Sequence, residues 1–501
     1  AELREGSLKD ALGDVDLSDA DIRVKYGNSE LSVAGQGKFD GHAVDIGWRE
    51  LFGAKVPFRR RYDLKGTVPA ALVGKAGFPS PEPFVTGPVG IAIQYQVATN
   101  GTGELTGRFD LKAAKLTLPP LAWTKDAGVD ARLVLALKLA AGGRLTTAEF
   151  DSRGNGLEAK GRVRFNGDNS VQQVSLQSVK IGQTDIAVDW RRGPEGVELD
   201  LSGTALELPR VQNMLRARNE LAAKQPRGAA AAAQARTKVT LKLQKIIVKR
   251  GTLGYLNGQL AFSGERVTSA DLTLGGGKGA TFRVTPAGNN RHFFFYVADF
   301  GELLKDAGWI DGLAGGYLHI EGQFNDLWAD PPLDGILKMG PYRLQVVTPR
   351  PDVGTLNAAI EGLGRAGDST QQFDSLEAKL VKVGDRIDIR DGRTSGRSIG
   401  LTTQGWLDLG SETAQLRGVV VPAFALNNLL SNVPLLGPLL TGGKDGGLFA
   451  ISYSLEGPFD DLKSNVSMMS AMTPGVLREI FNAPRDGSTP VPPTREMERA
   501  P

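Results

Sequence analysis

Short stretches in which apolar and charged residues alternate run through this chain. In residues 157–167 (LEAKGRVRFNG), the apolar side chains fall at odd positions: Leu157, Ala159, Val163 and Phe165. The even positions between them carry Glu158, Lys160, Arg162 and Arg164. Successive side chains of a strand point to opposite faces of a sheet. The alternation therefore predicts a strand with one face in water and the other against apolar material.

The same alternation recurs along most of the sequence, with turn-forming residues at intervals. Examples are Ile22, Val24, Tyr26; Val44, Ile46, Trp48; Ile186, Val188, Trp190; Val197, Leu199, Leu201; and Leu318, Ile320. Period-2 alternation between turns is typical of an antiparallel sheet with one solvated face. We therefore predict a mainly β fold, an elongated and repetitive antiparallel sheet curved into a groove, with a few short helices.

A weak internal repeat supports this interpretation. The segments GKFDG (37–41), VDIGWRE and DLKGT (63–67) recur in the same order as VRFNG (163–167), TDIAVDWRR and DLSGT (200–204). Matching order of three short signals predicts a duplicated unit of strands.

Helix-forming composition is confined to a few segments. Residues 208–236 are alanine-rich, and 299–313 (DFGELLKDAGWIDGL) place Asp299 as an N-cap with Glu302 three positions later. Residues 422–440 and 467–481 are short apolar helix candidates, and the stretch from 484 has the composition of a disordered tail. We expect β-groove repeats over 1–206 and 238–420, a helix and linker over 207–237, an apolar helical cap over 421–483 and a tail over 484–501.

So many strands with so few helices pose a packing problem. About 30 short strands can be counted, and their apolar face must be closed, paired or filled. A barrel, a sandwich or stacked repeats would hide that face. A long trough filled by an apolar ligand would do so too, and it would be about 150 Å long at the usual strand spacing. Composition alone does not choose between trough and sandwich.

The sequence lacks the motifs that are typical of several classes of function. The net charge of +3 comes without clustered Lys and Arg, apart from Arg59–Arg61. We interpret this run as a solvated strand or turn, with contact to anionic headgroups as the alternative. We expect no nucleic-acid partner. There are no cysteines, and the three histidines are far apart in the sequence. No metal-binding, phosphate-loop or nucleophile motif is found. We therefore predict a protein that is not an enzyme and has no cofactor, no metal and no catalytic residues.

The membrane signals are also limited. The best apolar stretch, GVVVPAFALNNLLSNVPLLGPLL, contains asparagines and prolines that argue against a spanning helix. The chain begins with Ala and has no apolar leader. We therefore expect a mature or excised piece whose targeting segment lies upstream.

Two segments resemble the AsmA-like superfamily, and most closely its large YhdP-like branch with an AsmA-like C-terminal region. They are YVADFGELLKDAGWIDGLAGGYLHIEGQF (296–324) and the run from IDIRDG to LEGPFDD (387–461). The matching elements include ADFG, VVPAFALN, NVPLLG, GGLFAISY and the closing TPGVLREIF. The family's Asn-Pro-Leu-like stretch before that closing segment is replaced here by NVSMMSAMTPG. The strong resemblance covers about residues 290–483.

The resemblance implies a bridge-type lipid-transport protein of the Gram-negative cell envelope. Such proteins are anchored in the inner membrane by an N-terminal helix and extend a β-groove across the periplasm. They are thought to carry phospholipid toward the outer membrane. The expected partners are phospholipid acyl chains, the inner membrane through an anchor upstream of this chain, and the outer membrane or one of its proteins.

Within that resemblance, two groups of residues have expected roles. The groove lining would include Leu157, Ala159, Val163, Phe165, Ile186, Val188, Trp190, Val197, Leu199, Leu201, Leu318 and Ile320. A C-terminal cap or membrane contact would include Leu429, Leu430, Val433, Pro434, Leu435, Leu436, Gly437, Met468, Met469, Pro474 and Gly475. The alternatives are an ordinary sandwich core for the first group and a core-capping helix for the second.

A different class of function fits the same pattern of strands. The sheet could act as a periplasmic assembly factor that pairs with outer-membrane proteins through its edge strands. A continuous apolar lining favours the lipid conduit, whereas a filled interior with an exposed terminal edge favours the assembly factor.

Overall fold

The fold is described here from a computed structural model. It describes residues 1–53, 55–76, 81–121, 123–214, 236–264, 266–275, 279–309, 312–328, 330–345, 370–397, 399–422, 449–459 and 462–470. Strands make up 71% of the structure, in a long mixed sheet of about 30 strands that is not closed into a barrel within these residues. The predicted mainly β fold is therefore confirmed. The chain divides into two compact units, residues 1–248 with 263–265, and residues 249–262 with 266–501.

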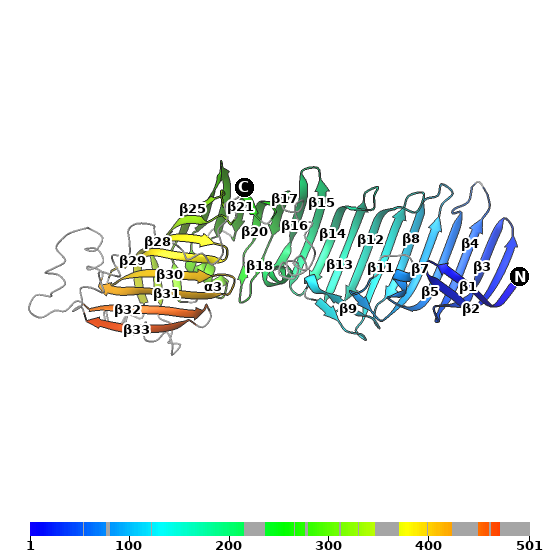
Figure 1. Ribbon diagram of the computed structural model, residues 1–501, viewed down its shortest axis with the longest axis horizontal. Coiled ribbons are helices and arrows are strands. Elements are labelled where there is room, and N and C mark those ends of the chain that lie inside the picture. The colour runs from blue at the N-terminus through cyan, green and yellow to red at the C-terminus, as the bar shows by residue number, and fades with distance from the viewer. Residues whose placement is uncertain are drawn as a thin grey trace, which may run out of the picture. The chain divides into compact units, whose positions relative to one another are not determined.

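The main sheet of the first unit is a series of long strands that are neighbours in chain order (Figure 1). The antiparallel strands are β1 (Glu2–Leu12), β2 (Val15–Gly27), β3 (Glu30–Phe39), β4 (His42–Leu51), β5 (Arg60–Pro69), β7 (Pro88–Val97), β8 (Gly103–Asp110), β11 (Ala131–Leu139), β12 (Leu145–Gly154), β13 (Leu157–Phe165), β14 (Val171–Ile181), β15 (Thr184–Gly193) and β16 (Gly196–Glu207). Strand β16 then pairs in parallel with β17 (Arg236–Leu243) and β18 (Ile246–Ile247). Residues 208–214 form the described start of the predicted 208–236 helix.

A small layer covers one end of the apolar face of this sheet. It consists of α1 (Leu72–Lys75), β6 (Val85–Thr86), β9 (Lys115–Leu118), the 3-10 turn η1 (Pro119–Leu121) and β10 (Trp123–Lys125). Strands β10, β9 and β6 form their own sheet, and Figure 1 shows β9 beside one set of strand ends. Leu72, Leu116 and Trp123 of this layer share a buried cluster with Val44 and Leu157 of the main sheet.

A fully buried lysine holds this layer in place. The side chain of Lys125 has no exposed surface. Its Nζ donates to the backbone carbonyl oxygens of Leu111, Lys112 and Ala114, at 2.7, 3.1 and 2.5 Å. These carbonyls follow the end of β8, so the ammonium group connects the small sheet to the main sheet. Burial lowers the pKa of Lys125, and the three acceptors compensate for its loss of water.

Replacing Lys125 by methionine should destabilise the first unit by about 2–4 kcal/mol, because carbonyl groups that accept from a charged donor would lose it. Denaturant unfolding of the full chain measures this change. The matched control is Lys115→Met on β9, where the side chain is exposed and a change within about 0.5 kcal/mol is expected. Equal stability of the two variants would show that the buried ammonium group does not hold the layer.

The second unit repeats the architecture with a different cover. Its strands are β19 (Thr252–Leu253), β20 (Leu256–Ser263), β21 (Arg266–Leu274), β22 (Ala280–Ala287), β23 (Asn290–Val297), β24 (Leu313–Gly315), β25 (Leu318–Asn325), β26 (Leu333–Met339), β27 (Tyr342–Gln345), β28 (Thr370–Val383), β29 (Arg386–Gly396), β30 (Ile399–Asp408), β31 (Thr413–Pro422), β32 (Phe449–Pro458) and β33 (Lys463–Ser470). From β21 to β23 and on through β25, β26 and β28 to β33, neighbouring strands pair antiparallel.

The predicted helix cap at Asp299 is confirmed, but the helix is shorter than predicted. Helix α3 (Phe300–Asp306) begins after Asp299, whose carboxylate accepts from the backbone N–H of Glu302 at 2.9 Å. The helix ends at Asp306, and Gly308 follows with a φ of +68°. Residues 313–315 belong to strand β24, so the predicted helix over 299–313 is wrong in its C-terminal half.

The helix predicted over 467–481 is also wrong for its described part. Residues 467–470 lie in β33, where Met468 pairs with Ile451 of β32 and Met469 pairs with Ala450. The neighbouring strand offers backbone hydrogen-bond partners, and this tertiary pairing overrides a weak helix preference. The helix predicted over 422–440 lies outside the described residues, except for Pro422, which ends β31.

Two buried tyrosines lie in the core of the second unit, together with Phe373 and Val420. The ring of Tyr342 stacks on that of Phe373 at 5.1 Å between centroids. The hydroxyl of Tyr453 donates to the carbonyl oxygen of Thr402 at 2.9 Å. Burial raises the pKa of Tyr342 from 10.0 to about 12, because the phenolate would lose its water.

This pKa predicts a loss of stability at alkaline pH. The folded state favours the neutral phenol of Tyr342, so its contribution is complete below pH 10.0 and is lost as the pH rises to about 12. A shift of this size corresponds to on the order of 2–3 kcal/mol. We expect Tyr342→Phe to reduce the fall in unfolding free energy between pH 9 and pH 12, measured with urea. An identical fall in both proteins would contradict this assignment.

Candidate functional site

The apolar face of the first unit continues in register across its whole main sheet. Residues directly opposite each other on paired strands share one face, and we call such a row a rung. One rung, which we call the central rung, has a member on every strand of the main sheet from β1 to β17. Its members in strand order are Leu3, Ile22, Gly35, Ile46, Leu64, Ile93, Gly107, Leu135, Phe150, Gly161, Leu176, Val188, Leu201 and Leu241. The rung contains only apolar residues and glycine.

The degree of burial changes along the strands. At the covered end, Val44, Val68 and Ile181 are 2%, 3% and 3% exposed. The large side chains of the central rung are only half-buried, apart from Leu3, which is exposed. A sandwich would bury a central rung as completely as the covered end. Within the described residues, most of this apolar face therefore has no second layer of protein over it.

The predicted lining residues of the first unit share this face. Register relates all of them through β13 to β16: Leu157, Ala159, Val163, Phe165, Ile186, Val188, Trp190, Val197, Leu199 and Leu201. Leu157 lies in the buried cluster under the small layer, whereas the others are half-buried on the open part. In the second unit, Leu318 is 5% exposed in the core, and Ile320 packs against that core.

The predicted repeat corresponds to two strand pairs with equivalent registers. In the pair β4–β5, Val44 lies opposite Gly66 and Ile46 opposite Leu64. In the pair β15–β16, Ile186 lies opposite Gly203 and Val188 opposite Leu201. The next residue on this face is a tryptophan in both copies, Trp48 and Trp190. The first segment of the repeat differs, because β14 is inserted between β13 and β15 in the second copy.

The repeated glycine has a steric cause at Gly203. A Cβ atom at this position would lie 2.3 Å from the carbonyl oxygen of Asp185 and 2.7 Å from the Cα of Ile186. The pairing of β15 with β16 shifts register at this point, so the two backbones approach closely beside a bulge.

Gly203→Ala should therefore destabilise the first unit by about 1–3 kcal/mol, because the backbone must move to admit a methyl group. The matched control is Gly27→Ala at the end of β2, where a Cβ would meet nothing within 4 Å. Thermal unfolding of the two variants compares them directly. A control variant as unstable as Gly203→Ala would indicate that glycine flexibility, and not close approach, explains the effect.

The second unit carries an equivalent apolar rung. Its members from β21 to β32 are Ala270, Val284, Phe293, Gly322, Gly335, Leu380, Ile389, Gly405, Leu416 and Leu455. One end of this face is covered by α3 together with β24 and β27, which contribute Leu303, Leu313 and Tyr342 to the buried cluster.

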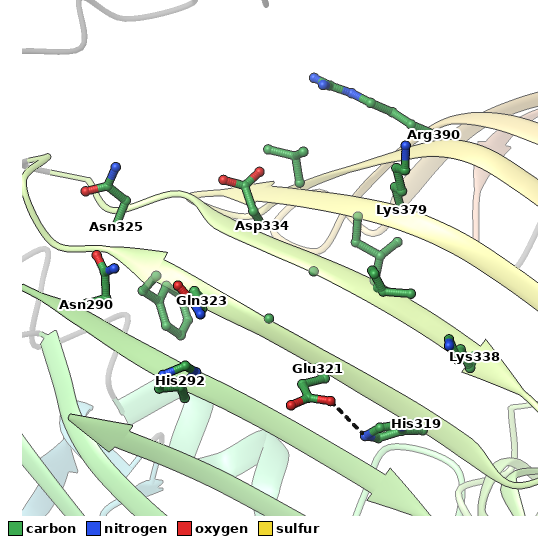
Figure 2. A pocket seen from close by; sticks show the side chains of 16 residues that line it. Asn290, His292, His319, Glu321, Gln323, Asn325, Asp334, Lys338, Lys379 and Arg390 are labelled. Atoms are coloured by element: carbon green, nitrogen blue, oxygen red, sulfur yellow. Dashed lines mark ion pairs between the residues drawn. The ribbon is translucent and has the colours of Figure 1, made fainter. Parts of the chain in front are cut away.

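Shallow hollows occur on the opposite, polar faces of the described sheets. One, of about 810 Å³, lies on β23, β25, β26, β28 and β29 of the second unit. Figure 2 shows His292 and Gln323 on one side of it and Lys379 and Arg390 on the other. Another hollow, of about 1000 Å³, lies in the first unit, where Lys65, Arg108 and Arg132 contribute to its lining. Both are lined by charges of both signs.

The hollow of Figure 2 brings together two histidines that are distant in the sequence. His319 lies 3.8 Å from the carboxylate of Glu321, and His292 lies opposite Gln323 on the next strand. Lys338 and Lys379 form ion pairs with Glu377 and Asp391 at 3.8 and 3.4 Å. No group of three metal-type side chains is found in the described part of the chain. This arrangement is typical of a solvated sheet face with paired charges.

The predicted C-terminal cap lies outside the described residues, apart from two methionines. Leu429, Leu430, Val433, Pro434, Leu435, Leu436, Gly437, Pro474 and Gly475 all lie outside the described residues. Met468 and Met469 belong to strand β33, where the structure describes their backbone only.

The sequence reasoning missed one cluster on the apolar face. Trp48, Tyr62 and Tyr95 lie opposite one another on β4, β5 and β7. Trp48 was visible as part of an alternating run, but cross-strand register was needed to bring the two tyrosines to it.

No protein-family model, curated protein or solved structure matches the chain. In the described part, no helix has both the length and the apolar character needed to cross a bilayer. The resemblance to AsmA-like proteins therefore stays a prediction from the sequence motifs.

Proposed function

We propose that this protein is a non-enzymatic carrier of phospholipid, whose acyl chains occupy the open apolar face of its sheets. The observation that supports the proposal is the central rung, which stays apolar from Leu3 to Leu241 without a polar interruption. An apolar face of this extent requires a cover in water, and the small layer covers only one end of it.

The energetics favour an acyl chain as that cover. Burial of one CH₂ group contributes about 0.8 kcal/mol, so a chain of about 16 carbons gains on the order of 10 kcal/mol. The hydrophobic effect has no direction. A lipid could therefore pass from strand to strand along the rungs without a large barrier, as transport requires.

The motif resemblance supplies the cellular setting of the proposal. We propose that the chain acts in the periplasm, attached to the inner membrane by a segment upstream, and passes phospholipid toward the outer membrane or one of its proteins. The contact with the outer membrane would involve the C-terminal segment around residues 429–437.

A second candidate function is an assembly factor that pairs with other strands. Strand β1 favours it, because β1 pairs only with β2 among the described strands and its Leu3 and Leu8 are 52% and 59% exposed. A partner strand could add to this edge. That role would leave the rest of the open apolar face without a cover.

Charges on the proposed lining should abolish lipid binding. We expect phospholipid to co-purify with the wild type, as measured by mass spectrometry of extracts, and at least tenfold less with Val163→Asp/Val188→Asp. A buried carboxylate beside an acyl chain loses its water without gaining a partner.

The matched control carries two aspartates on the polar face of neighbouring strands, Ser178→Asp/Ser202→Asp. These positions lie opposite Lys160 and Lys242, so the variant should fold and retain lipid. Circular dichroism checks that each variant is folded. A lipid-free wild type, or an unfolded lining variant beside a folded control, would mean that these valines are ordinary core and would favour the assembly factor.

A further inference from the structure

On β4, β5 and β7, the apolar face becomes more polar in regular steps toward its uncovered edge, which we call the rim. Successive rungs on the same face are two residues apart along each strand. From the covered end outward, they read Val44, Gly66, Ile91; then Ile46, Leu64, Ile93; then Trp48, Tyr62, Tyr95; and finally Glu50, Arg60, Val97. The order is aliphatic, aliphatic, aromatic and charged, which is the order of polarity from the tail of an amphiphile to its head.

The aromatic rung is a continuous stack. The ring centroids of Trp48 and Tyr62 are 6.2 Å apart with planes at 8°, and those of Tyr62 and Tyr95 are 6.0 Å apart with planes at 18°. Tyr62 is 38% exposed. The buried indole N–H of Trp48 has no hydrogen-bond acceptor among the described residues, an arrangement that is unfavourable when it persists. An oxygen-bearing ligand on this rung would offer the missing acceptor.

The charged rung carries more positive than negative charge. The carboxylate of Glu50 is nearly buried, with the residue 9% exposed, and it pairs with Arg60 at 3.2 Å and with Arg59 at 3.5 Å. The two guanidinium side chains remain 44% and 50% exposed. Glu50 raises the pKa of Arg60, first through its hydrogen bond and then through its charge. Two guanidinium groups on one carboxylate leave one net positive charge at the rim.

The same order recurs in the second copy of the repeat. On β15, the residues of this face are Ile186, Val188, Trp190 and Arg192 in turn. The guanidinium carbon of Arg192 lies 5.8 Å from the centroid of the Trp190 ring. An aromatic step followed by a cationic step therefore occurs at two separate places along the same edge of the face.

We propose that this rim, formed by Arg59, Arg60 and the Trp48–Tyr62–Tyr95 stack, binds the head region of a glycerophospholipid. The guanidinium groups take the phosphodiester, whose single negative charge matches the net charge of the rim. The aromatic stack takes the glycerol ester region, as amphipathic rings do at a membrane interface. The proposal rests on the proposed function, because the acyl chains must occupy the uncovered apolar face next to the rim, on the Ile46–Leu64–Ile93 rung and its continuation across the neighbouring strands.

The test distinguishes the contribution of the lipid head to binding from that of the acyl chains. Binding to the full-length chain is measured with a fluorescent phosphatidylcholine and with a diacylglycerol that carries the same chains but no phosphate. The variant is Arg59→Gln/Arg60→Gln, in which the amides can still donate to Glu50. The control is Arg162→Gln on the polar face, where Arg162 pairs with Glu149 at similar exposure.

We expect the rim variant to bind phosphatidylcholine about five- to tenfold more weakly, as for the loss of a charge-assisted contact. Its affinity for diacylglycerol should stay within about twofold, and the control should bind both lipids like the wild type. Excess inorganic phosphate should not displace the phospholipid. Displacement by phosphate would show a phosphate site without lipid selectivity and would overturn the proposal.

The remaining outcomes distinguish this proposal from the proposed function. Equal loss of both lipids in the rim variant would assign the arginines to folding of the rim and overturn the head site. Unchanged binding of both lipids by the rim variant would overturn the head site and leave the lipid carrier standing. Failure of the wild type to bind either lipid would overturn both.

A second variant examines the indole group separately. Trp48→Phe keeps a ring in the stack and removes the N–H group. We expect about threefold weaker binding of the diester phospholipid and no change for its diether analogue, which lacks the carbonyl acceptors. Equal weakening for both lipids would overturn the placement of the ester region on the aromatic rung.

Discussion

Burial of one face of each sheet is the physical requirement on which the rest of this structure depends. Water hydrates the charged side chains of a strand such as β13, but exposure of its apolar side chains to water is unfavourable. In both units a short layer covers one end of that face, and buried side chains such as Val44 and Val297 lie there. Beyond that layer the apolar residues of the first unit are only half-buried. This incompletely buried apolar face is the physical basis for proposing a lipid as its cover.

A continuous lining depends on backbone irregularities as much as on apolar composition. In β14 a bulge lies between Leu176 and Val179, so residues of opposite parity share one face. Glycines such as Gly161 and Gly203 lie beside bulges, where the neighbouring backbone leaves no room for a side chain. These positions let the strands bend while the rungs stay aligned. Register, and with it the lining, would be lost if such a glycine could not be accommodated.

The two faces of the sheet have different chemistry and, in our proposals, different roles. The polar face carries paired charges such as Arg162 with Glu149 and Lys338 with Glu377, and its hollows contain both signs. The other face changes from aliphatic to aromatic to charged along β4 and β5. A carrier of amphiphiles needs such a gradient of polarity, because the ligand has an apolar tail that avoids water and a polar head that requires it.

The sequence by itself determined the class of fold and the identity of the apolar face. Alternation in segments such as 157–167 is a local property of a strand, so Val163, Val188 and Leu201 could be assigned to the apolar face before the strands were paired. Their role as a groove lining was predicted only from the family resemblance. The N-cap at Asp299 was equally readable, because a cap involves only the next three residues. The open or filled state of the interior could not be read in this way.

Only the tertiary structure decided which strands are neighbours and where the cover lies. The stack of Trp48, Tyr62 and Tyr95 and the sharing of Glu50 by two arginines depend on register between strands. The three carbonyls that hold Lys125 come together only through the turn after β8. Residues 467–470 became a strand because β32 offers them partners. These contacts join residues that are separated in the chain, and a local pattern carries no information about such pairing.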